Sequence, residues 1–376
     1  VSVAEPALVP AGFSGRIWAM TPLAVEPFVL PQSSESPDAG GFLAVARLFN
    51  DQQREIWGND DFCETAQALR AGLQSTSTRR RQLLVARAGA GQEILGVARL
   101  NLPLTDNLHT ATINVVVDAR SRRRGIGAAL CAAAEEQAAA DGRRTLIAET
   151  DHPQDGGEVT AVDVPASFIP QDAAASFALS CGFSLELIER ISRLDLPVHG
   201  AGDGLPDSTG SSGYELVFWQ DACPEALVDA YAQLRQKMST DAPLGGLDLT
   251  PEVWDAPRVR EAEEKARGMG YDVLVCAVRQ VASGELAGHT VLEVARSNPG
   301  VAYQDDTLVL QHHRGNRLGM MLKAGNLQQL GQLFPDVRRV YTWNAEENRY
   351  MLAINDQLGF RPIGYAGEWQ KELQIR

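Results

Sequence analysis

The stretch from Val115 to Leu130 constrains the fold of this chain more than any other segment. It opens with three valines, which are typical of the end of a buried strand, and runs through Arg122-x-x-Gly125-x-Gly127 into apolar residues at helical spacing. A strand that leads through a glycine loop into a helix forms an anion site, because backbone N–H groups converge there and the helix dipole favours negative charge. We therefore predict a strand, a phosphate-binding loop and a helix.

The glycine spacing does not by itself identify the ligand. No Gly-Lys-Ser/Thr follows, so this is not a Walker A loop, and a full G-x-G-x-x-G fingerprint is missing. Gly125 and Gly127 would let a phosphate approach the backbone. Arg122, Arg123 and Arg124 add positive charge, although not all three can face one ligand. The alternative is an ordinary tight turn beside a solvated basic run.

The segments after the loop sharpen this prediction. A strand is expected at Thr145–Glu149, followed by a helix and then by the tripeptide Cys181–Phe183. The order strand, Arg-x-x-Gly-x-Gly, helix, strand, helix resembles the GNAT (GCN5-related) N-acetyltransferase superfamily. In that superfamily the loop holds the pyrophosphate of acetyl-coenzyme A (acetyl-CoA), so the resemblance implies the same role here.

The same order returns in the second half of the chain. Residues 197–213 are poor in apolar side chains and rich in Gly, Ser, Asp and Pro, as in a linker. Gly319 stands 192 residues after Gly127, about half of the 376 residues, and an internal duplication explains this spacing best. We predict an α/β fold with mixed sheets, in which residues 1–196 and 214–376 form two GNAT-like domains.

The resemblance covers nearly the whole chain and is greatest to the tandem GNAT proteins of high-GC actinobacteria, a group that includes mycothiol synthase. It implies an acetyl-CoA-dependent N-acetyltransferase that moves an acetyl group to the primary amine of a small molecule by direct attack of the amine on the thioester. One alternative is a coenzyme A-binding regulatory or structural module in which one or both domains have lost their chemistry. Another is transfer of a longer acyl group, or transfer to a protein lysine.

The second loop departs from the first. It keeps Arg314 and Gly319 but has Arg317 where Gly125 stands. The Arg317 side chain either blocks the approach of a phosphate to the backbone or turns outward to pair with that phosphate. We therefore predict that coenzyme A binds at the first loop rather than at the second.

Two asparagines follow the second loop. Asn344 is expected at a strand end, and Asn348 stands where many GNAT enzymes carry an Asn that contacts the cofactor. The candidate cofactor-binding residues that the resemblance implies are Val115, Val117, Arg122, Arg123, Arg124, Gly125, Ile126, Gly127, Ala128, Val309, Arg314, Gly315, Asn316, Arg317, Leu318, Gly319, Asn344 and Asn348.

Acetyl transfer to an amine also needs a base and a proton for the leaving thiolate. In many GNAT enzymes a tyrosine four residues before a Gly-Phe pair supplies that proton, but Ala178 and Asn355 occupy these positions here. The base candidates are Asp306, upstream of the second loop, and Glu149, at the end of the first-half strand. Because Asp305 and Asp306 are adjacent, we expect them to point to opposite faces of their strand. Asp306, Glu149 and Asn355 are the catalytic candidates.

Composition limits the partners and the setting. A net charge of −14 disfavours nucleic acid and suits a cationic amine. Five scattered cysteines without C-x-x-C favour reduced thiols in the cytoplasm, and no apolar run reaches membrane-spanning length. We find no metal-ligand spacing among His109, His289, His312 and His313. We expect a monomer or homodimer with no nucleic-acid, membrane or metal partner.

Two segments have open alternatives. The first strand lies either at Arg16–Met20 or at Pro27–Leu30. The first half is also longer between its loop and its Gly-Phe pair than the second half, and the extra residues fall in Thr150–Gln171. That segment is either a loop over the substrate or a tolerated surface insertion.

Overall fold

The computed structural model describes residues 23–88, 93–154, 161–164, 167–197 and 213–374. The first half contributes eight strands and four helices to this description, together with the short 3₁₀ turn η1 (Ala119–Ser121). In chain order they are β1 (Leu23–Phe28), α1 (Gly40–Trp57), α2 (Ala66–Leu73), β2 (Arg79–Ala88), β3 (Ile94–Pro103), β4 (Thr110–Val117), α3 (Ile126–Ala140), β5 (Thr145–Pro153), β6 (Ala161–Val164), β7 (Ser167–Pro170), α4 (Ala173–Ser180) and β8 (Ser184–Asp195).

The second half repeats this order without a counterpart of the β6–β7 hairpin in the part of the chain described. Two 3₁₀ turns, η2 (Glu225–Leu227) and η3 (Gln311–His313), accompany its longer elements. These are β9 (Tyr214–Gln220), α5 (Val228–Asp241), α6 (Ala256–Met269), β10 (Tyr271–Gln280), β11 (Leu286–Ala295), β12 (Val301–Val309), α7 (Leu318–Leu333), β13 (Arg339–Ala345), α8 (Arg349–Leu358) and β14 (Arg361–Glu372).

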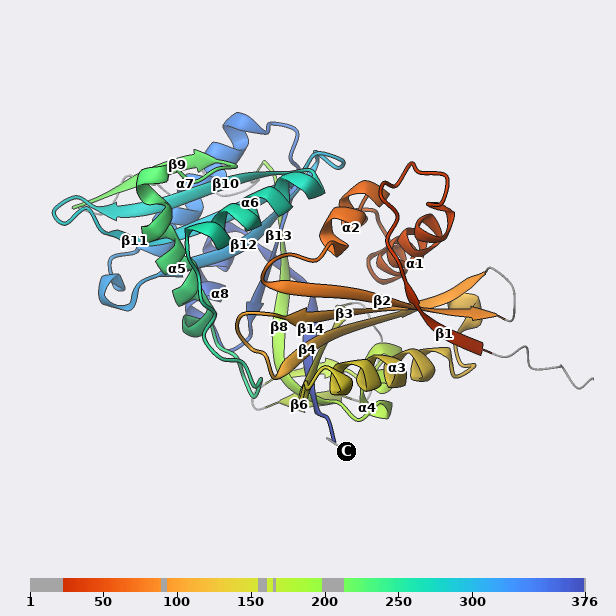
Figure 1. Cartoon of the computed structure of the whole chain (residues 1–376). Coiled ribbons are helices and arrows are strands. Elements are labelled where there is room, and N and C mark those ends of the chain that lie inside the picture. The colour runs from red at the N-terminus through yellow and green to blue at the C-terminus, as the bar shows by residue number, and fades with distance from the viewer. Residues whose placement is uncertain (1–22, 89–92, 155–160, 165–166, 198–212, 375–376) are drawn as a thin grey trace, which may run out of the picture.

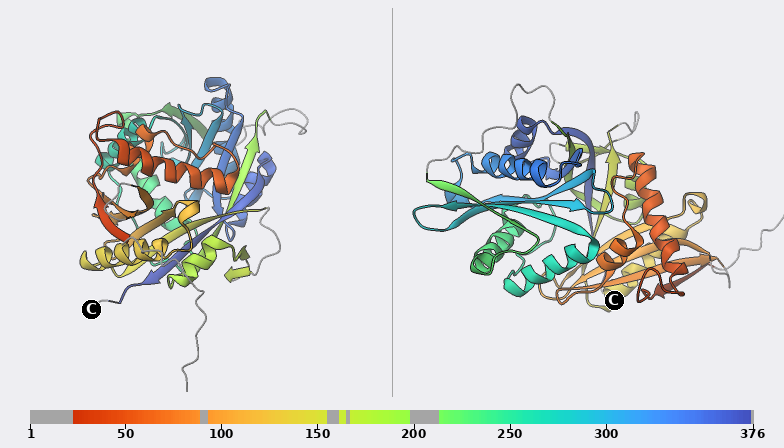
Figure 2. Two further views of the ribbon diagram at one scale, coloured as in Figure 1. Left: turned by 90° about the vertical axis from the view of Figure 1, so that its right-hand side faces the viewer. Right: turned by 90° about the horizontal axis from the view of Figure 1, so that it is seen from above.

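Alternating side chains divide each half into layers. On β2, Leu83 and Val85 belong to a core cluster with α1 and α2, whereas Leu84 and Ala86 belong to a cluster with α3. Successive side chains of a strand point to opposite faces, so this alternation places α1 and α2 on one face of the sheet and α3 on the other (Figure 1). The second half has the same layers, with α5 and α6 on one face and α7 on the other (Figure 2). The predicted mixed α/β class is confirmed.

A single twelve-stranded sheet runs through both halves. Its order is β1-β2-β3-β4-β5-β14-β8-β13-β12-β11-β10-β9. The last strand of the first half, β8, pairs with β13 of the second half, and the last strand of the second half, β14, pairs with β5 of the first. β8 and β14 also pair with each other at the centre, where they cross between the two lobes in Figure 1. Each half therefore completes the sheet of the other. The predicted division of the chain at 197–213 does not include this exchange of strands.

A buried ion pair joins the helical layer of the first half to the sheet of the second. Asp61, between α1 and α2, accepts hydrogen bonds from Arg339 Nε at 2.5 Å and from the Tyr341 hydroxyl at 2.5 Å. Phe62 packs beside it against Trp343, with ring centroids 5.9 Å apart. Charge-assisted hydrogen bonds of this kind are strong and depend on geometry. The contacts of Asp61 with Arg339 and Tyr341 therefore hold the first-half helices over β13.

The two open alternatives of the sequence are partly resolved. β1 overlaps the predicted Pro27–Leu30 strand, and the Arg16–Met20 alternative lies outside the described residues. The long segment Thr150–Gln171 contains the end of β5 and the strands β6 and β7, which pair as a separate two-stranded sheet. Most of the linker 197–213 lies outside the described residues. Within the described chain, no helix is long and apolar enough to cross a membrane.

Candidate active site

The first loop has the geometry of an anion site. Two of its residues take the left-handed backbone conformation, Arg123 with φ 61° and Gly125 with φ 82°. They turn the chain into α3, whose first N–H groups have no partner inside the helix. A side chain added at Gly125 would meet open space. Arg123 and Arg124 are exposed beside it, so the residues present fit a phosphate at the start of α3.

Arg122 contributes to the loop in a different way from the one that the resemblance implies. Its Nε donates to the carbonyl oxygen of Val117 at 3.1 Å, and its two terminal nitrogens contact the Glu55 carboxylate at 2.6 and 2.5 Å. This bidentate pair ties the loop to α1. In this conformation Arg122 holds the shape of the loop, and the loop backbone, Arg123 and Arg124 remain as the groups that could contact an anion.

The second loop repeats this construction. Arg314 Nε donates to the carbonyl oxygen of Val309 at 3.1 Å, and its guanidinium contacts Asp241 of α5 at 3.0 Å. Gly315 and Arg317 take the two left-handed positions, with φ 85° and 57°. Arg317 thus adopts the backbone conformation that Gly125 has in the first loop, and its side chain is exposed. The loop is closed in the same way in both halves.

The second glycine of each loop serves the packing of helices. A Cβ atom at Gly127 would lie 3.1 Å from the Phe177 ring of α4, and one at Gly319 would lie 2.9 Å from Ile354 of α8. A larger residue would force the Phe177 ring or the Ile354 side chain to move, so both glycines allow close packing of helices whether or not a phosphate is bound. Gly125, where an added side chain would meet open space, is therefore the glycine that a phosphate could approach, whereas Gly127 faces Phe177.

The sheet opens beside each loop. Parallel pairing between β4 and β5 ends at Ile113 and Ala148, and that between β12 and β13 ends at Gln304 and Thr342. Beyond these points β4 still pairs with β3. From Asn114 towards the first loop, the other edge of β4 no longer pairs with β5. Backbone groups at such an opening are free to contact a bound ligand.

Four carboxylates share one face of the central strands. Glu149 of β5 pairs with Glu368 of β14. One row further along, Asp151 of β5 and Glu189 of β8 both pair with Ala366 of β14. Paired residues of antiparallel strands point to the same side, and so do residues two apart on one strand, so all four carboxylates face the same way. Only Glu149 was predicted as a site residue.

Asp151, Glu189 and Glu368 have raised pKa values. Burial and the nearby Glu149 raise the pKa of Asp151 to about 7, and the same two causes raise the pKa of Glu189 to about 7. The pKa of Glu368 is raised further, by burial, by the charges of Glu149 and Glu189 and by a hydrogen bond to Glu149. Four like charges on one face cannot all ionise freely, so this face exchanges protons near neutral pH.

The equivalent positions of the second half are apolar except for Glu189, which the two halves share. Trp343 pairs with Ile191 where Glu149 pairs with Glu368 in the first half. Ala345 pairs with Glu189 in the row that corresponds to Asp151 and Ala366. The duplicated fold thus carries carboxylates on one side of its centre and aromatic or aliphatic side chains on the other. Sequence reasoning missed this contrast because the strands are exchanged between the halves.

Asp306 is held in an ion pair. Arg235 of α5 contacts Asp306 at 2.8 Å and Asp305 at 3.2 Å, and its guanidinium stacks on Trp254 at 4.7 Å. The expectation that the two aspartates point to opposite faces is wrong, because a β-bulge places both of them opposite the single residue Val291 of β11. Burial raises the pKa of Asp306 to about 7 although Arg235 opposes that shift.

Asn344, Asn348 and Asn355 serve the structure around α8. Asn348 caps this helix by accepting from the backbone N–H of Met351 at 3.2 Å. Asn355 is buried within α8, and its Nδ2 donates to Asn344 Oδ1 at 2.6 Å. An amide N–H is too weak an acid to protonate a thiolate, so the catalytic candidate Asn355 cannot replace the tyrosine as a proton donor.

A buried hydrogen-bond chain lies behind the carboxylate face. His152 is fully buried, with Nδ1 2.8 Å from Asp172 Oδ2 and Nε2 2.7 Å from Thr150 Oγ1. Trp369 Nε1 donates to the same Thr150 oxygen at 2.7 Å. Asp172 also caps α4. Spacing along the sequence could not show this arrangement, because Asp172 lies across the β6–β7 hairpin and Trp369 comes from the other half.

Comparison with known proteins decides the family. Residues 42–157 match the model of the Acetyltransferase (GNAT) family. The whole fold is similar to a tandem GNAT protein from the clavulanic acid biosynthesis pathway, solved without AcCoA, with 27% identity over 94% of this chain and 99% of that chain and a TM-score of 0.74. This chain is a tandem GNAT protein. It is an acyltransferase, and its family carries out acetyl transfer that depends on acetyl-CoA.

Two further structures share the fold of this tandem GNAT protein. A GCN5-related N-acetyltransferase from Sphaerobacter thermophilus is 14% identical over 94% of this chain and 96% of that chain, with a TM-score of 0.61. The GCN5-related glucosamine N-acetyltransferase region of a fungal multi-domain GH3 beta-N-acetylglucosaminidase is 14% identical over 94% of this chain and 38% of that chain, with a TM-score of 0.64. No curated protein sequence matches the chain. The likeness to mycothiol synthase stays a prediction.

Proposed function

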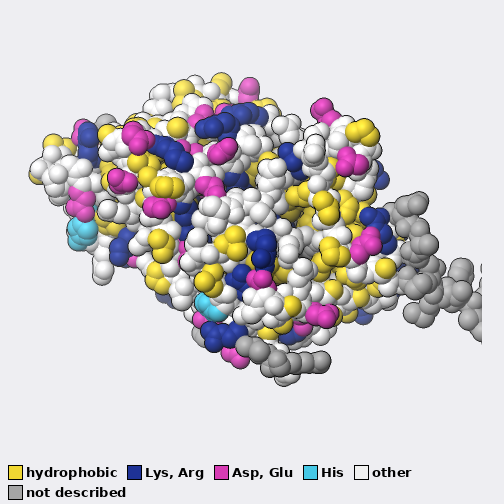
Figure 3. Space-filling model, in the orientation of Figure 1, with side chains coloured by type: hydrophobic (Ala, Val, Ile, Leu, Met, Phe, Trp, Pro, Cys, Tyr) yellow, Lys and Arg dark blue, Asp and Glu magenta, His cyan; other side chains and the backbone are white. Residues whose placement is uncertain are grey.

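We propose that the first half transfers an acetyl group from acetyl-CoA to the primary amine of a small cationic molecule. The observation that carries this proposal is the carboxylate face formed by Glu149, Asp151, Glu189 and Glu368. An amine is a cation at neutral pH, and like-charged carboxylates on one face attract it. The net charge of the chain is −14, but charges of both signs are interspersed on the face in Figure 3. That face therefore shows no single acidic patch that would attract the amine in place of these carboxylates.

The spacing of the carboxylates suits an organic cation. Within the described residues, no three of these oxygens come close enough together to coordinate one metal ion. The next row on the same face carries Trp343, beside Phe62 and Trp57 of the α1–α2 segment. Aromatic rings stabilise a cation that lies over them. We assign the charged end of the acceptor to the carboxylates and its body to these rings.

The same carboxyls supply the base. An ammonium group must lose a proton before its nitrogen attacks the thioester, and a base with a pKa near the working pH does this best. Asp151 and Glu189 have pKa values of about 7. We assign the proton transfer to this cluster, in which Glu149 is the candidate that the sequence predicts.

The remaining steps use the backbone and water. Amide groups where β4 leaves β5 would polarise the thioester carbonyl. The amine nitrogen forms a bond to the carbonyl carbon, the carbon–sulfur bond breaks, and the sulfur takes a proton and leaves as the thiol of coenzyme A. Ala178 stands where many GNAT enzymes carry a tyrosine, so we assign the proton on sulfur to water.

The second half is proposed as a partner without amine chemistry. Asp306 is paired with Arg235, and apart from Glu189 the positions that correspond to the carboxylate face are apolar. The second half still contributes Glu368 of β14 to the first site. The missing tyrosine favours one alternative function, a coenzyme A-binding module that does not turn over. A cytoplasmic location and a monomeric or homodimeric state remain part of this proposal.

Release of coenzyme A thiol with a panel of primary amines and diamines tests the proposal. We expect turnover with a cationic amine, and Glu189→Gln and Glu149→Gln should each lower kcat/KM by about 100-fold or more. Asp306→Asn is the matched control, because it also neutralises a carboxyl with a raised pKa, and it should change kcat/KM by less than about threefold. Binding of acetyl-CoA without turnover for any amine would establish the alternative module. Loss of activity in Asp306→Asn alone would move the site to the second half.

A further inference from the structure

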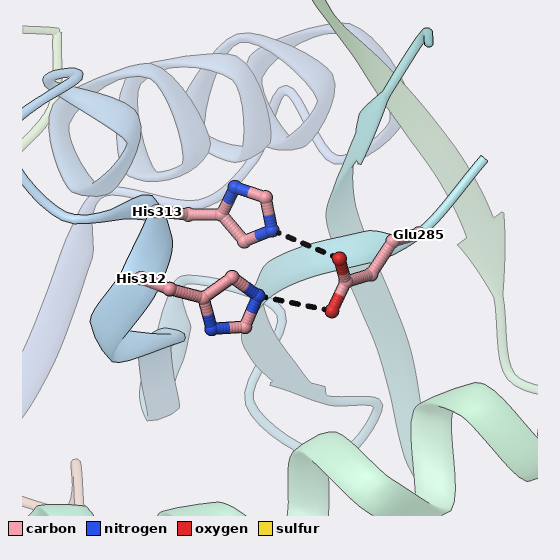
Figure 4. A group of neighbouring side chains, drawn as sticks. All are labelled: Glu285, His312 and His313. Carbon is pink, nitrogen blue, oxygen red and sulfur yellow. Dashed lines mark hydrogen bonds and ion pairs between the residues drawn. The ribbon is translucent and has the colours of Figure 1, made fainter. Parts of the chain in front are cut away.

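Two histidines and a glutamate meet at the entrance of the second loop. His312 Nε2 lies 3.1 Å from one carboxylate oxygen of Glu285, and His313 Nε2 lies 3.2 Å from the other. Figure 4 shows both imidazole rings turned towards the same carboxylate, His312 and His313 from η3 and Glu285 from the turn before β11. All three ligand atoms lie within 4.8 Å of one another. In the described part of the chain, no other group of His, Cys, Asp or Glu side chains is arranged in this way.

His313 is oriented by a second contact. Its side chain is buried, and its Nδ1 lies 2.9 Å from the Tyr214 hydroxyl. The Tyr214 ring packs edge-on against the imidazole, with centroids 5.7 Å apart. A histidine that binds a metal through one ring nitrogen commonly donates its other N–H to an oxygen, which fixes the ring and its tautomer. The Tyr214 hydroxyl is placed to accept this hydrogen bond from His313 Nδ1, and His313 Nε2 faces Glu285.

The matched positions of the first half show that this set does not belong to the duplicated fold. Glu93, Arg120 and Ser121 stand 192 residues before Glu285, His312 and His313. Arg120 is a permanent cation there and pairs with Asp118 at 3.2 Å. A guanidinium and a hydroxyl do not make a site for a divalent ion, so the two histidines are a feature of the second half alone.

We propose that Glu285, His312 and His313 bind a divalent transition metal ion of the zinc type at the entrance of the second loop. Imidazole nitrogen and carboxylate oxygen are ligands that zinc accepts, with bonds of about 2.0–2.2 Å. Tetrahedral bonds of that length hold the ligand atoms about 3.4 Å apart. Each histidine Nε2 lies 3.1 or 3.2 Å from a different oxygen of Glu285, and the three ligand atoms lie within 4.8 Å of one another, so small side-chain movements bring them to this spacing. The two imidazoles, with ring centroids 4.2 Å apart, complete three ligands, and water takes the fourth position.

The place of the site gives the ion a structural effect. His313 is followed directly by Arg314, Gly315 and the rest of the second loop. The ion would tie this loop to the turn between β10 and β11. It would restrict η3 and the start of α7 without touching the first site. This inference does not depend on acetyl transfer, because it concerns side chains that the proposed reaction does not use.

Titration of the metal-free full chain with Zn²⁺, followed by calorimetry, tests the site. We expect one saturable equivalent and a higher melting temperature with the ion bound. Co²⁺ should give visible absorption bands of a low-coordinate site. His312→Gln changes an exposed side chain and should weaken binding by about 100-fold or more, as should Glu285→Gln. Tyr214→Phe should weaken it by about tenfold.

Glu93→Gln is the matched control, because it alters the corresponding glutamate of the first half, and it should leave binding unchanged. The difference between the unaltered chain and His312→Gln also separates this site from the five cysteine thiols. Two outcomes overturn the proposal: no saturable binding below about millimolar Zn²⁺, or binding that His312→Gln and Glu285→Gln leave intact. In either case the three side chains form a hydrogen-bonded cluster without a metal ion.

Discussion

At the scale of single residues, the two loops differ in where they place glycine and agree in conformation. Gly125 and Arg317 share the left-handed backbone conformation, and so do Arg123 and Gly315. A non-glycine residue in that conformation costs roughly 1 kcal/mol. Each loop has one such residue, Arg123 in the first and Arg317 in the second, at different positions of the loop. The Arg317 side chain therefore does not change the path of the backbone that would meet a phosphate.

Substitution at Gly125 separates the effects of charge and bulk. Gly125→Glu should weaken binding of coenzyme A by more than about tenfold, since a carboxylate would face the pyrophosphate. Gly125→Arg should bind within about tenfold of the unaltered chain, because Arg317 already shows that this backbone accepts an arginine. Calorimetric titration measures both. Equal losses in the two variants would show that any side chain at this position excludes the cofactor.

Arg317→Glu is the control for that experiment, because it places the same charge at the corresponding position of the second loop. It is a better choice than a change at Gly319, where any Cβ atom would press on Ile354 and disturb the fold. We expect Arg317→Glu to leave acetyl transfer unchanged. If it abolishes activity while Gly125→Glu does not, the second half holds the productive cofactor.

At the scale of elements, the carboxylates of β5, β8 and β14 give the protein a characteristic pH dependence. Asp151 and Glu189 hold their protons to about pH 7 in the folded chain, but carboxyls lose them near pH 4 when unfolded. Between these values the folded state binds more protons, so the free energy of unfolding falls as pH rises. The destabilisation is complete above about pH 7. A cationic acceptor on this face would offset it.

Glu189→Gln should reverse part of this effect. Relative to the unaltered chain, we expect no stabilisation at pH 4 and a gain on the order of 1–3 kcal/mol at pH 8, because the variant has no charge to desolvate. Urea unfolding at a series of pH values measures the difference. Glu136→Gln, an exposed glutamate of α3, serves as the control. A gain that is the same at every pH would mean that the charge of Glu189 is not its cause.

Local patterns predicted the loops and their elements but not the composition of the faces. The strand before Arg122 and the helix after Gly127 follow from apolar periodicity, which depends on neighbouring residues alone. Asp305 and Asp306 broke the rule of alternation because a bulge is set by pairing with β11. The carboxylate face and the contact of His312 with Glu285 depend on distant segments, which no spacing within one sequence reveals.

At the scale of the whole molecule, exchange of β8 and β14 joins the two halves. Residues 364–372 of β14 pair with residues 145–153 of β5, and residues 189–195 of β8 pair with residues 339–345 of β13. Trp369 of β14 is fully buried in the core of the first half. A half that lost its borrowed strand would expose both a sheet edge and a gap in its core.

Cleavage between the halves should therefore leave the molecule assembled. We expect a chain with a protease site placed in 198–212 to elute at its original volume in size-exclusion chromatography after complete cleavage, because the exchanged strands hold the fragments together. Acetyl transfer should also persist. An otherwise identical chain without the protease site controls for the protease itself. Separation of the fragments in native buffer would contradict the exchange.

The exchange also orders events during synthesis. The strand that carries Glu368 and Trp369 is β14, which follows every other described element of both halves. During synthesis the first half therefore lacks the strand that borders β5 until the ribosome has also made the second half. A nascent chain that stalls earlier has a complete first loop and an incomplete acceptor face. Synthesis of β14 is thus the step that completes the sheet and the core of the first half.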